Sequence, residues 1–130
     1  MRERFSFDYA VVRVVPRVER GEFLNAGVIL FCPTAGYLES RIGLDRERLK
    51  ALAPLTDFSA VESYLELIPL ICAGGGEAGS IGELPQRARF HWLVAPRSTV
   101  IQMSPVHSGV HHDLDAALSR LFAKLVLAPG

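Results

Sequence analysis

The chain has 130 residues, and its 14 Lys and Arg residues balance 14 Asp and Glu residues, so that the net charge at pH 7 is zero. Hydrophobic residues make up 49% of it and charged residues 22%, which excludes a disordered chain, a coiled coil and a collagen-like fibre. A balanced charge argues against nucleic acid as a partner, because no basic field covers the whole surface. The length predicts a single domain over residues 1–130 that buries its core without a disulfide or a metal.

The N-terminal third of the chain has the alternating pattern of strands. Residues 5–15 become apolar on both faces, which predicts a strand in the interior of a sheet. Pro16 ends this strand because it removes an amide donor, and Gly21 supplies the turn to a second strand at residues 23–32. A third strand follows at residues 37–42. Three successive strands with short connections predict an antiparallel meander.

The middle of the chain has helical periodicity. Asp45 is predicted to cap a short helix that Pro54 closes, and a capping box at residues 59–62 is predicted to open a longer helix. Pro69 is expected to kink this longer helix or to end it early. The glycine-rich residues 74–80 suit neither helix nor strand, and we expect a mobile loop there.

The last part of the chain is predicted to contain a helix from Pro85 to Val94, a strand over residues 98–104 and a final helix capped by Asp113. The order of elements predicts an α+β domain. We expect a mostly antiparallel sheet of about four strands, namely the N-terminal three-strand meander plus one later strand, with helices packed on one face.

No apolar run approaches the ~18 residues that a membrane span needs, and the N-terminus lacks the apolar stretch of a signal peptide. Cys32 and Cys72 both lie in apolar stretches and are expected to be buried free thiols. These features predict a cytoplasmic protein with no membrane partner.

No cofactor and no metal site is predicted: His107, His111 and His112 lack the accompanying cysteines of a zinc site, and we expect them in a solvated loop.

The first candidate site consists of polar residues on the first two strands and in their connection. Arg13 comes from a strand with apolar neighbours, so its guanidinium needs a partner, for which Glu22 is a candidate. Asn25 is a polar residue of an otherwise apolar strand, with Gly27 expected on the same face, and Arg20 lies in the connection. These residues are interpreted either as a network that fixes the hairpin or as a pocket for an anion or a carboxylate.

The second candidate site begins with Arg97 and Ser98 at the start of the predicted fourth strand, with His107 beyond its end. A straight strand would separate Arg97 from His107 by roughly 20–25 Å, which is too far for one small ligand. Residues 51–83 carry five acids and no Lys or Arg, whereas residues 84–112 carry three arginines, all four histidines and no acid. This pattern is compatible with a local anion site near Arg97.

Trp92 lies on a different face of its predicted helix from Phe90 and Leu93, which we expect in the core. Trp92 is expected to be buried as well, because an indole usually contributes to a core. An exposed Trp92 would instead mark a partner surface.

The stretches YAVVRVVPRVERGEFLNAGVILFCP at residues 9–33 and RFHWLVAPRSTVIQMSPVHSG at residues 89–109 resemble a bacterial family catalogued as domain of unknown function 3037. With the spacing between them they cover most of the chain. The resemblance implies a small stand-alone cytosolic protein, implies no particular activity and favours a role beside a partner. The residues that match the two blocks are Arg13, Arg20, Gly21, Glu22, Asn25 and Gly27 in the first, and Arg97, Ser98, Ser104, Pro105 and His107 in the second.

The leading hypothesis from the sequence is a non-enzymatic accessory domain that binds a ligand, a protein partner or a second copy of itself, with a polar Arg/Glu/Asn pocket as its site. The alternative is an enzyme that acts on a phosphate-bearing or nucleic-acid substrate. Its anion clamps would be Arg13, Arg20 and Arg97, and its acid or base would be His107 or Glu22. A third interpretation is a purely structural hairpin with the apolar helices as an interaction surface.

Overall fold

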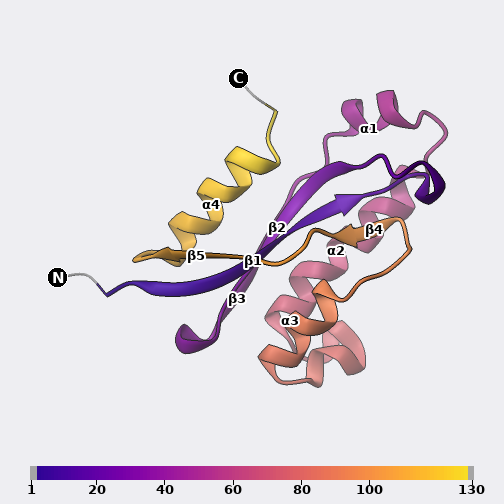
Figure 1. The fold of residues 1–130 in the computed structure, drawn as a ribbon. Helices are drawn as coiled ribbons and strands as arrows, with labels where there is room; N and C mark the ends of the chain where they lie inside the picture. The colour runs from indigo at the N-terminus through magenta and orange to yellow at the C-terminus, as the bar shows by residue number, and fades with distance from the viewer. Residues whose placement is uncertain (1–2, 129–130) are drawn as a thin grey trace.

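The computed structural model describes residues 3–128, which form one antiparallel sheet with helices packed against both of its faces (Figure 1). The strands are β1 (Phe5–Val14), β2 (Leu24–Cys32), β3 (Tyr37–Ile42), β4 (Ile101–Met103) and β5 (His107–His111). The helices are α1 (Arg46–Leu52), α2 (Phe58–Ala73), α3 (Gln86–Val94) and α4 (Leu114–Leu125). Short 3-10 turns occupy Val18–Arg20 and Pro33–Ala35, and Gly76–Glu83 consists of 3-10 turns interrupted at Gly79.

β1 lies in the interior of the sheet, as its two apolar faces predict. On one side it pairs with β2, which in turn pairs with β3 to complete the predicted meander. On its other side it pairs with two strands in succession: β5 along residues 5–9 and β4 along residues 12–14. The predicted α+β class and antiparallel sheet are therefore confirmed, and the sheet has a fifth strand because residues 107–111, expected in a loop, pair with β1.

The core consists of two clusters, one on each face of the sheet. The first cluster packs α2 and α3 against side chains such as Val12, Ile29 and Phe31. The second packs α4 against the alternate residues of the same strands, such as Phe7 and Leu30. Figure 1 shows α4 on the opposite side of the sheet from α2 and α3. The helices thus cover both faces, which differs from the expectation of one covered face, because β1 and β2 are apolar on both sides.

α2 begins earlier than predicted, and Pro69 does not end it. Asp57, rather than the expected Ser59, caps its N-terminus by accepting a hydrogen bond from the backbone N–H of Ala60. The helix also continues past Pro69 to Ala73. Pro69 is exposed, whereas Ile71 and Cys72 after it are buried in the core, so tertiary packing outweighs the lost hydrogen bond.

Ser104 joins β4 to β5 where the edge of the sheet is interrupted. The backbone N–H of Val11 donates to the Oγ of Ser104 at 2.8 Å, and the N–H of Ser104 donates back to the carbonyl of Val11 at 2.9 Å. The Ser104 hydroxyl itself donates to the carbonyl of Pro105 at 2.9 Å. A side chain that is only 4% exposed thereby replaces one bond of the backbone ladder.

Asp113 caps α4 as predicted, since its carboxylate accepts a hydrogen bond from the N–H of Ala116 at 3.0 Å. Replacing Asp113 by alanine is expected to lower the free energy of unfolding by about 1 kcal/mol, because the cap and the favourable charge at the helix N-terminus are both lost. Urea unfolding measures the change. Asp113→Asn, which keeps the acceptor oxygen, is the matched control and should retain most of the stability; equal losses in both variants would contradict the capping role.

Within residues 3–128, no helix combines the length and the hydropathy that a membrane crossing requires.

Cys32 and Cys72 are buried free thiols, as predicted. Burial raises the pKa of the Cys72 thiol to about 12, so this sulfur stays protonated at neutral pH and is a poor nucleophile.

Candidate functional site

Arg13 and Asn25 are brought together by a β-bulge. Their Cα atoms are partners across β1 and β2, but the register slips beside Val12, so that Ala26 is an extra residue on β2. The bulge turns Asn25 onto the face that α4 covers, while Gly27 stays opposite Val12 on the α2 face. The expectation that Asn25 and Gly27 share a face is therefore wrong, because simple alternation does not hold across a bulge.

Asn25 ties the end of α4 to the sheet, whereas Arg13 contacts Phe23. The side-chain amide of Asn25 donates to the carbonyl of Leu125 at 3.0 Å. The guanidinium carbon of Arg13 lies 4.1 Å from the centroid of the Phe23 ring, so an aromatic face takes the place of the expected partner Glu22. The Nε of Arg13 and the Oδ1 of Asn25 are both buried, and neither has a hydrogen-bond partner among the described residues.

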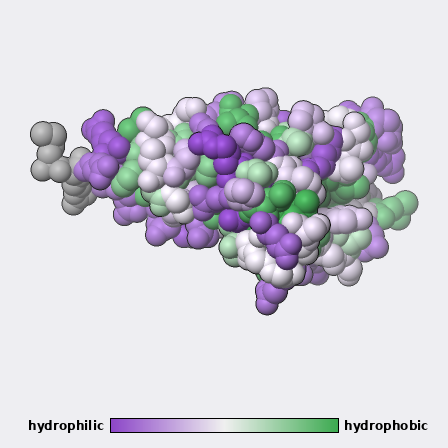
Figure 2. Space-filling model, turned by 90° about the horizontal axis from the view of Figure 1, so that it is seen from below, coloured by the Kyte–Doolittle hydropathy of each residue, from purple (hydrophilic) through white to green (hydrophobic). Residues whose placement is uncertain are grey.

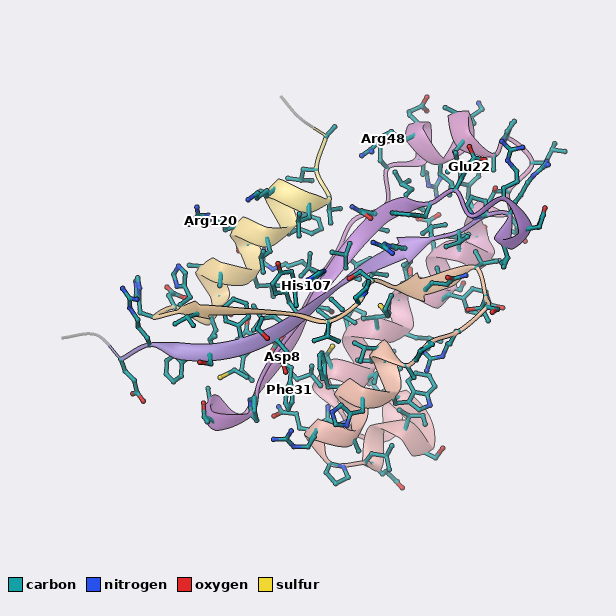
Figure 3. The ribbon with its side chains drawn as sticks, in the orientation of Figure 1. Asp8, Glu22, Phe31, Arg48, His107 and Arg120 are labelled. Atoms are coloured by element: carbon teal, nitrogen blue, oxygen red, sulfur yellow. The ribbon has the colours of Figure 1, made fainter. Side chains whose placement is uncertain are left out.

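Arg20 and Glu22 form an exposed ion pair in the β1–β2 connection. The hydrogen bond from Arg20 lowers the pKa of the Glu22 carboxyl, so this group is ionised at neutral pH and has no proton to donate. Figure 3 shows Glu22 and His107 well separated from each other. The two alternative candidates for the acid or base of the enzyme hypothesis therefore belong to different parts of the molecule.

His107 lies on β5, with its ring centroid 5.4 Å from that of Tyr9 on β1. His111 accepts a hydrogen bond at Nδ1 from the N–H of Asp113. Its ring stacks on that of His112, with the ring centroids 4.6 Å apart. No group of three or more His, Cys, Asp or Glu side chains in the described chain is arranged to hold a metal ion.

Arg97 lies on the α2–α3 side of the sheet, in the segment that leads from α3 into β4. Its guanidinium donates to the carbonyls of Trp92 and Leu93, the latter at 3.1 Å, and so caps the C-terminal end of α3. It also lies over the Trp92 ring, with the guanidinium carbon 4.2 Å from the ring centroid. Because Arg13 belongs to the α4 face, Arg13 and Arg97 cannot hold one small substrate between them.

A groove with a volume of about 440 Å³ opens beside Arg97. We call it the α2–α3 groove: its walls come from α2, from the end of α3 and from the segment 97–103, with Val18 at one side. The helical residues that line it are Tyr64, Leu67, Ile68, Ile71, Trp92 and Leu93. All of the residues 97–103 except Gln102 also line it.

The rim of the α2–α3 groove is an exposed apolar surface. Tyr64 is 57% exposed and Trp92 is 40% exposed, and Val18 and Leu67 are exposed to a similar degree. Figure 2 views the molecule from below the orientation of Figure 1 and shows patches of hydrophobic surface among polar side chains. The expectation that Trp92 is buried is wrong, because its indole lies at the rim against Arg97 rather than in the core with Phe90.

Three consecutive polar residues, beginning with Arg97, line the groove. Among the described residues, Arg97 is the only one with a charged side chain that lines it, and no carboxylate does so. Ser98 and Thr99 follow it directly. The hydroxyl of Thr99 donates to the carbonyl of Ile101 at 2.7 Å, whereas the hydroxyl of Ser98 has no hydrogen-bond partner among the described residues.

Sequence reasoning named Arg97 and Ser98 but missed the α2 side of the groove. Neither Tyr64 nor Leu67 was named as a candidate site residue. A signal was present, because the apolar residues of α2 include Leu67 and Leu70 beside its buried face, a wider arc than one contact with a sheet needs. Such excess apolar surface on a helix indicates a second contact or a binding surface.

The chain is thus an α+β domain in which an antiparallel sheet separates the polar Arg13–Asn25 pair, on the α4 side, from an apolar groove between α2 and α3. It belongs to the family described as protein of unknown function DUF3037, whose model matches residues 9–126. Both stretches that carry the sequence resemblance fall within the matched residues. The chain matches no curated protein and no solved structure.

Proposed function

We propose that this protein is a non-enzymatic binding domain whose ligand occupies the α2–α3 groove. The observation that carries the proposal is the concentration of apolar surface there. Of the ten large hydrophobic side chains that are exposed among the described residues, four line this one groove. They are Val18, Tyr64, Leu67 and Trp92. Contiguous apolar surface at a concave site is the usual mark of a binding site.

The dimensions of the groove support a ligand rather than a packing defect. Its volume of about 440 Å³ lies within the range of roughly 300–1,000 Å³ that is typical of ligand pockets. The Arg13–Asn25 pair supports a binding role less well, because the buried polar atoms there lie under the end of α4. A cytoplasmic location fits the proposal, since the two free thiols are typical of a reducing compartment. The expected accessory role and homodimer stay predictions.

The test uses the only tryptophan of the chain, Trp92, as a reporter within the groove itself. Titration with the neutral apolar dye N-phenyl-1-naphthylamine is expected to raise the dye's fluorescence and to quench Trp92. Leu67→Arg places a charge at the rim and should weaken the binding of the dye by at least about tenfold, since one apolar contact is lost and a charge must be desolvated.

Leu55→Arg is the matched control for this variant. Leu55 is 91% exposed and does not line the groove, so the same substitution there should leave dye binding unchanged. Circular dichroism checks that both variants are folded. The proposal is overturned if the wild-type protein leaves the dye fluorescence unchanged, or if the two variants bind the dye equally well.

A further inference from the structure

We propose that the ligand of the α2–α3 groove is a small amphiphile, an apolar chain or ring system with one anionic group, and that Arg97 binds the anion. This inference rests on the proposed function, because it concerns the same groove. It specifies what that function leaves open, namely the chemical class of the ligand and the residue that recognises its charge.

The charge of Arg97 is only partly compensated within the protein. Arg97 forms no ion pair with a carboxylate in the described chain, and its contacts are the carbonyls of Trp92 and Leu93 and the Trp92 ring. Carbonyl dipoles and an aromatic face carry partial charges only. The surrounding stretch, residues 84–112, contains no acid. An anion at the groove would therefore meet a cation without a competing carboxylate from its own stretch of chain.

The geometry of Arg97 also leaves donors for a ligand. The two carbonyls of α3 take one N–H from each terminal nitrogen of the guanidinium, so the Nε–H and a second N–H on each terminal nitrogen remain. The same two hydrogen bonds and the stacking on Trp92 hold the guanidinium in place before a ligand arrives. Binding then needs little further ordering of this side chain, which reduces its entropic cost.

The distribution of polarity in the groove matches an amphiphile. Arg97, Ser98 and Thr99 are consecutive, and Ser98 offers a hydroxyl without another partner in the described chain. Much of the remaining wall is aliphatic, from α2 and from the segment 100–103. A ligand with its acid at the 97–99 stretch and an apolar body along α2 satisfies both parts.

The size of the groove favours a small molecule over a protein segment. A stable protein interface buries about 800 Å² on each partner, spread over some 20–30 residues. The α2–α3 groove has thirteen lining residues around a single hollow of about 440 Å³. A free carboxylate of medium chain length fits this description, and it is the occupant to which the proposal commits.

The test compares decanoate with decanol at pH 7, both below the concentration at which they aggregate, by displacement of N-phenyl-1-naphthylamine and by quenching of Trp92. Decanoate is expected to bind about tenfold more tightly than decanol, because a charge-assisted hydrogen bond to a partly exposed arginine contributes about that factor. Raising the salt concentration should weaken decanoate binding and leave decanol binding unchanged. Acetate, which has the charge without the chain, should displace no dye.

Arg97→Gln should reduce the affinity for decanoate to that for decanol. Arg87→Gln is the matched control, since Arg87 is an exposed arginine of α3 that does not line the groove, and it should bind both ligands as the wild type does. Arg97 also caps α3, so folding of the variant is checked by circular dichroism; the comparison of decanoate with decanol and the salt dependence need no variant.

The outcomes separate this inference from the proposed function. Binding of the dye and of decanol without any preference for decanoate would overturn the anionic ligand and leave the apolar site standing. If the dye, decanol and decanoate all fail to bind, both this inference and the proposed function are overturned. Decanoate binding that Arg97→Gln and salt leave unchanged would show that Arg97 does not bind the anion.

Discussion

Replacing Phe31 by alanine is expected to lower the free energy of unfolding by about 3–5 kcal/mol, because a fully buried aromatic ring is lost and a cavity is left behind. Phe31 is 2% exposed and lies on β2 in the cluster that α2 and α3 cover. Its ring stacks on that of Phe90 of α3, with centroids 4.8 Å apart. The substitution therefore removes one of the contacts that hold α3, and with it one wall of the groove, in place.

Urea unfolding followed by far-ultraviolet circular dichroism measures this effect. Leu55→Ala is the control, because Leu55 is 91% exposed and its truncation should change the stability by less than about 0.5 kcal/mol. Phe31→Leu keeps most of the buried volume, so its loss of stability should lie between the losses of Phe31→Ala and Leu55→Ala. Equal unfolding midpoints for Phe31→Ala and Leu55→Ala would be incompatible with the packing described for β2 and α3.

A methyl group at Gly27 is expected to destabilise the protein by about 1–3 kcal/mol through overpacking. A Cβ atom there would lie 2.6 Å from the Cδ1 of Ile42 and 2.7 Å from the carbonyl oxygen of Arg41. The end of the Ile42 side chain can rotate away, but the carbonyl belongs to the ladder between β2 and β3. Gly27→Ala must therefore move a strand next to the bulge.

Gly76→Ala makes the same chemical change in open space, since no atom lies within 4 Å of the position of its Cβ. We expect the free energy of unfolding of this variant to lie within about 0.5 kcal/mol of the wild-type value. Replacing glycine reduces the conformational freedom of the unfolded chain, and this gain offsets any local cost in the folded state. Thermal unfolding of the two variants side by side gives the comparison. A loss of stability at Gly76 that equals the loss at Gly27 would refute the steric explanation.

The first three strands and the caps of α1 and α4 were predictable because their signals are local. Asp45 and Asp113 each accept a hydrogen bond from a backbone N–H three residues later, as their places before a helix indicate. The alternation of β1 likewise needs no knowledge of its partners. The bulge at Ala26 has no such signal, because it depends on how β2 is paired with β1, and it decided on which face Asn25 lies.

β5 was missed because its partner lies about a hundred residues away in the sequence. Residues 107–111 are rich in histidine, follow a proline and contain a glycine, so that their local pattern is that of a loop. The strand forms because the first half of β1 would otherwise be an unpaired edge. In the same way, Pro69 is compatible with α2 only because the residues after it pack on the sheet.

The candidate site was predictable only in part. Arg97 and Ser98 were recognised as a place for an anion from the uneven distribution of charge along the chain. The apolar half of the groove required the packing of α2 beside the segment 97–103, a contact between distant parts of the sequence. The exposure of Trp92 follows from that packing, since Arg97 holds the indole at the rim.

The interruption of the sheet edge at Ser104 has a mechanical consequence for the groove. β4, which forms one of its walls, is held to β1 by three residue pairs, whereas β5 is held by five. This wall therefore has the shorter ladder with β1, and it can move without breaking the β5 ladder. For the proposed ligand, we expect selection by the charge at Arg97 and tolerance of variation in the length of the apolar chain.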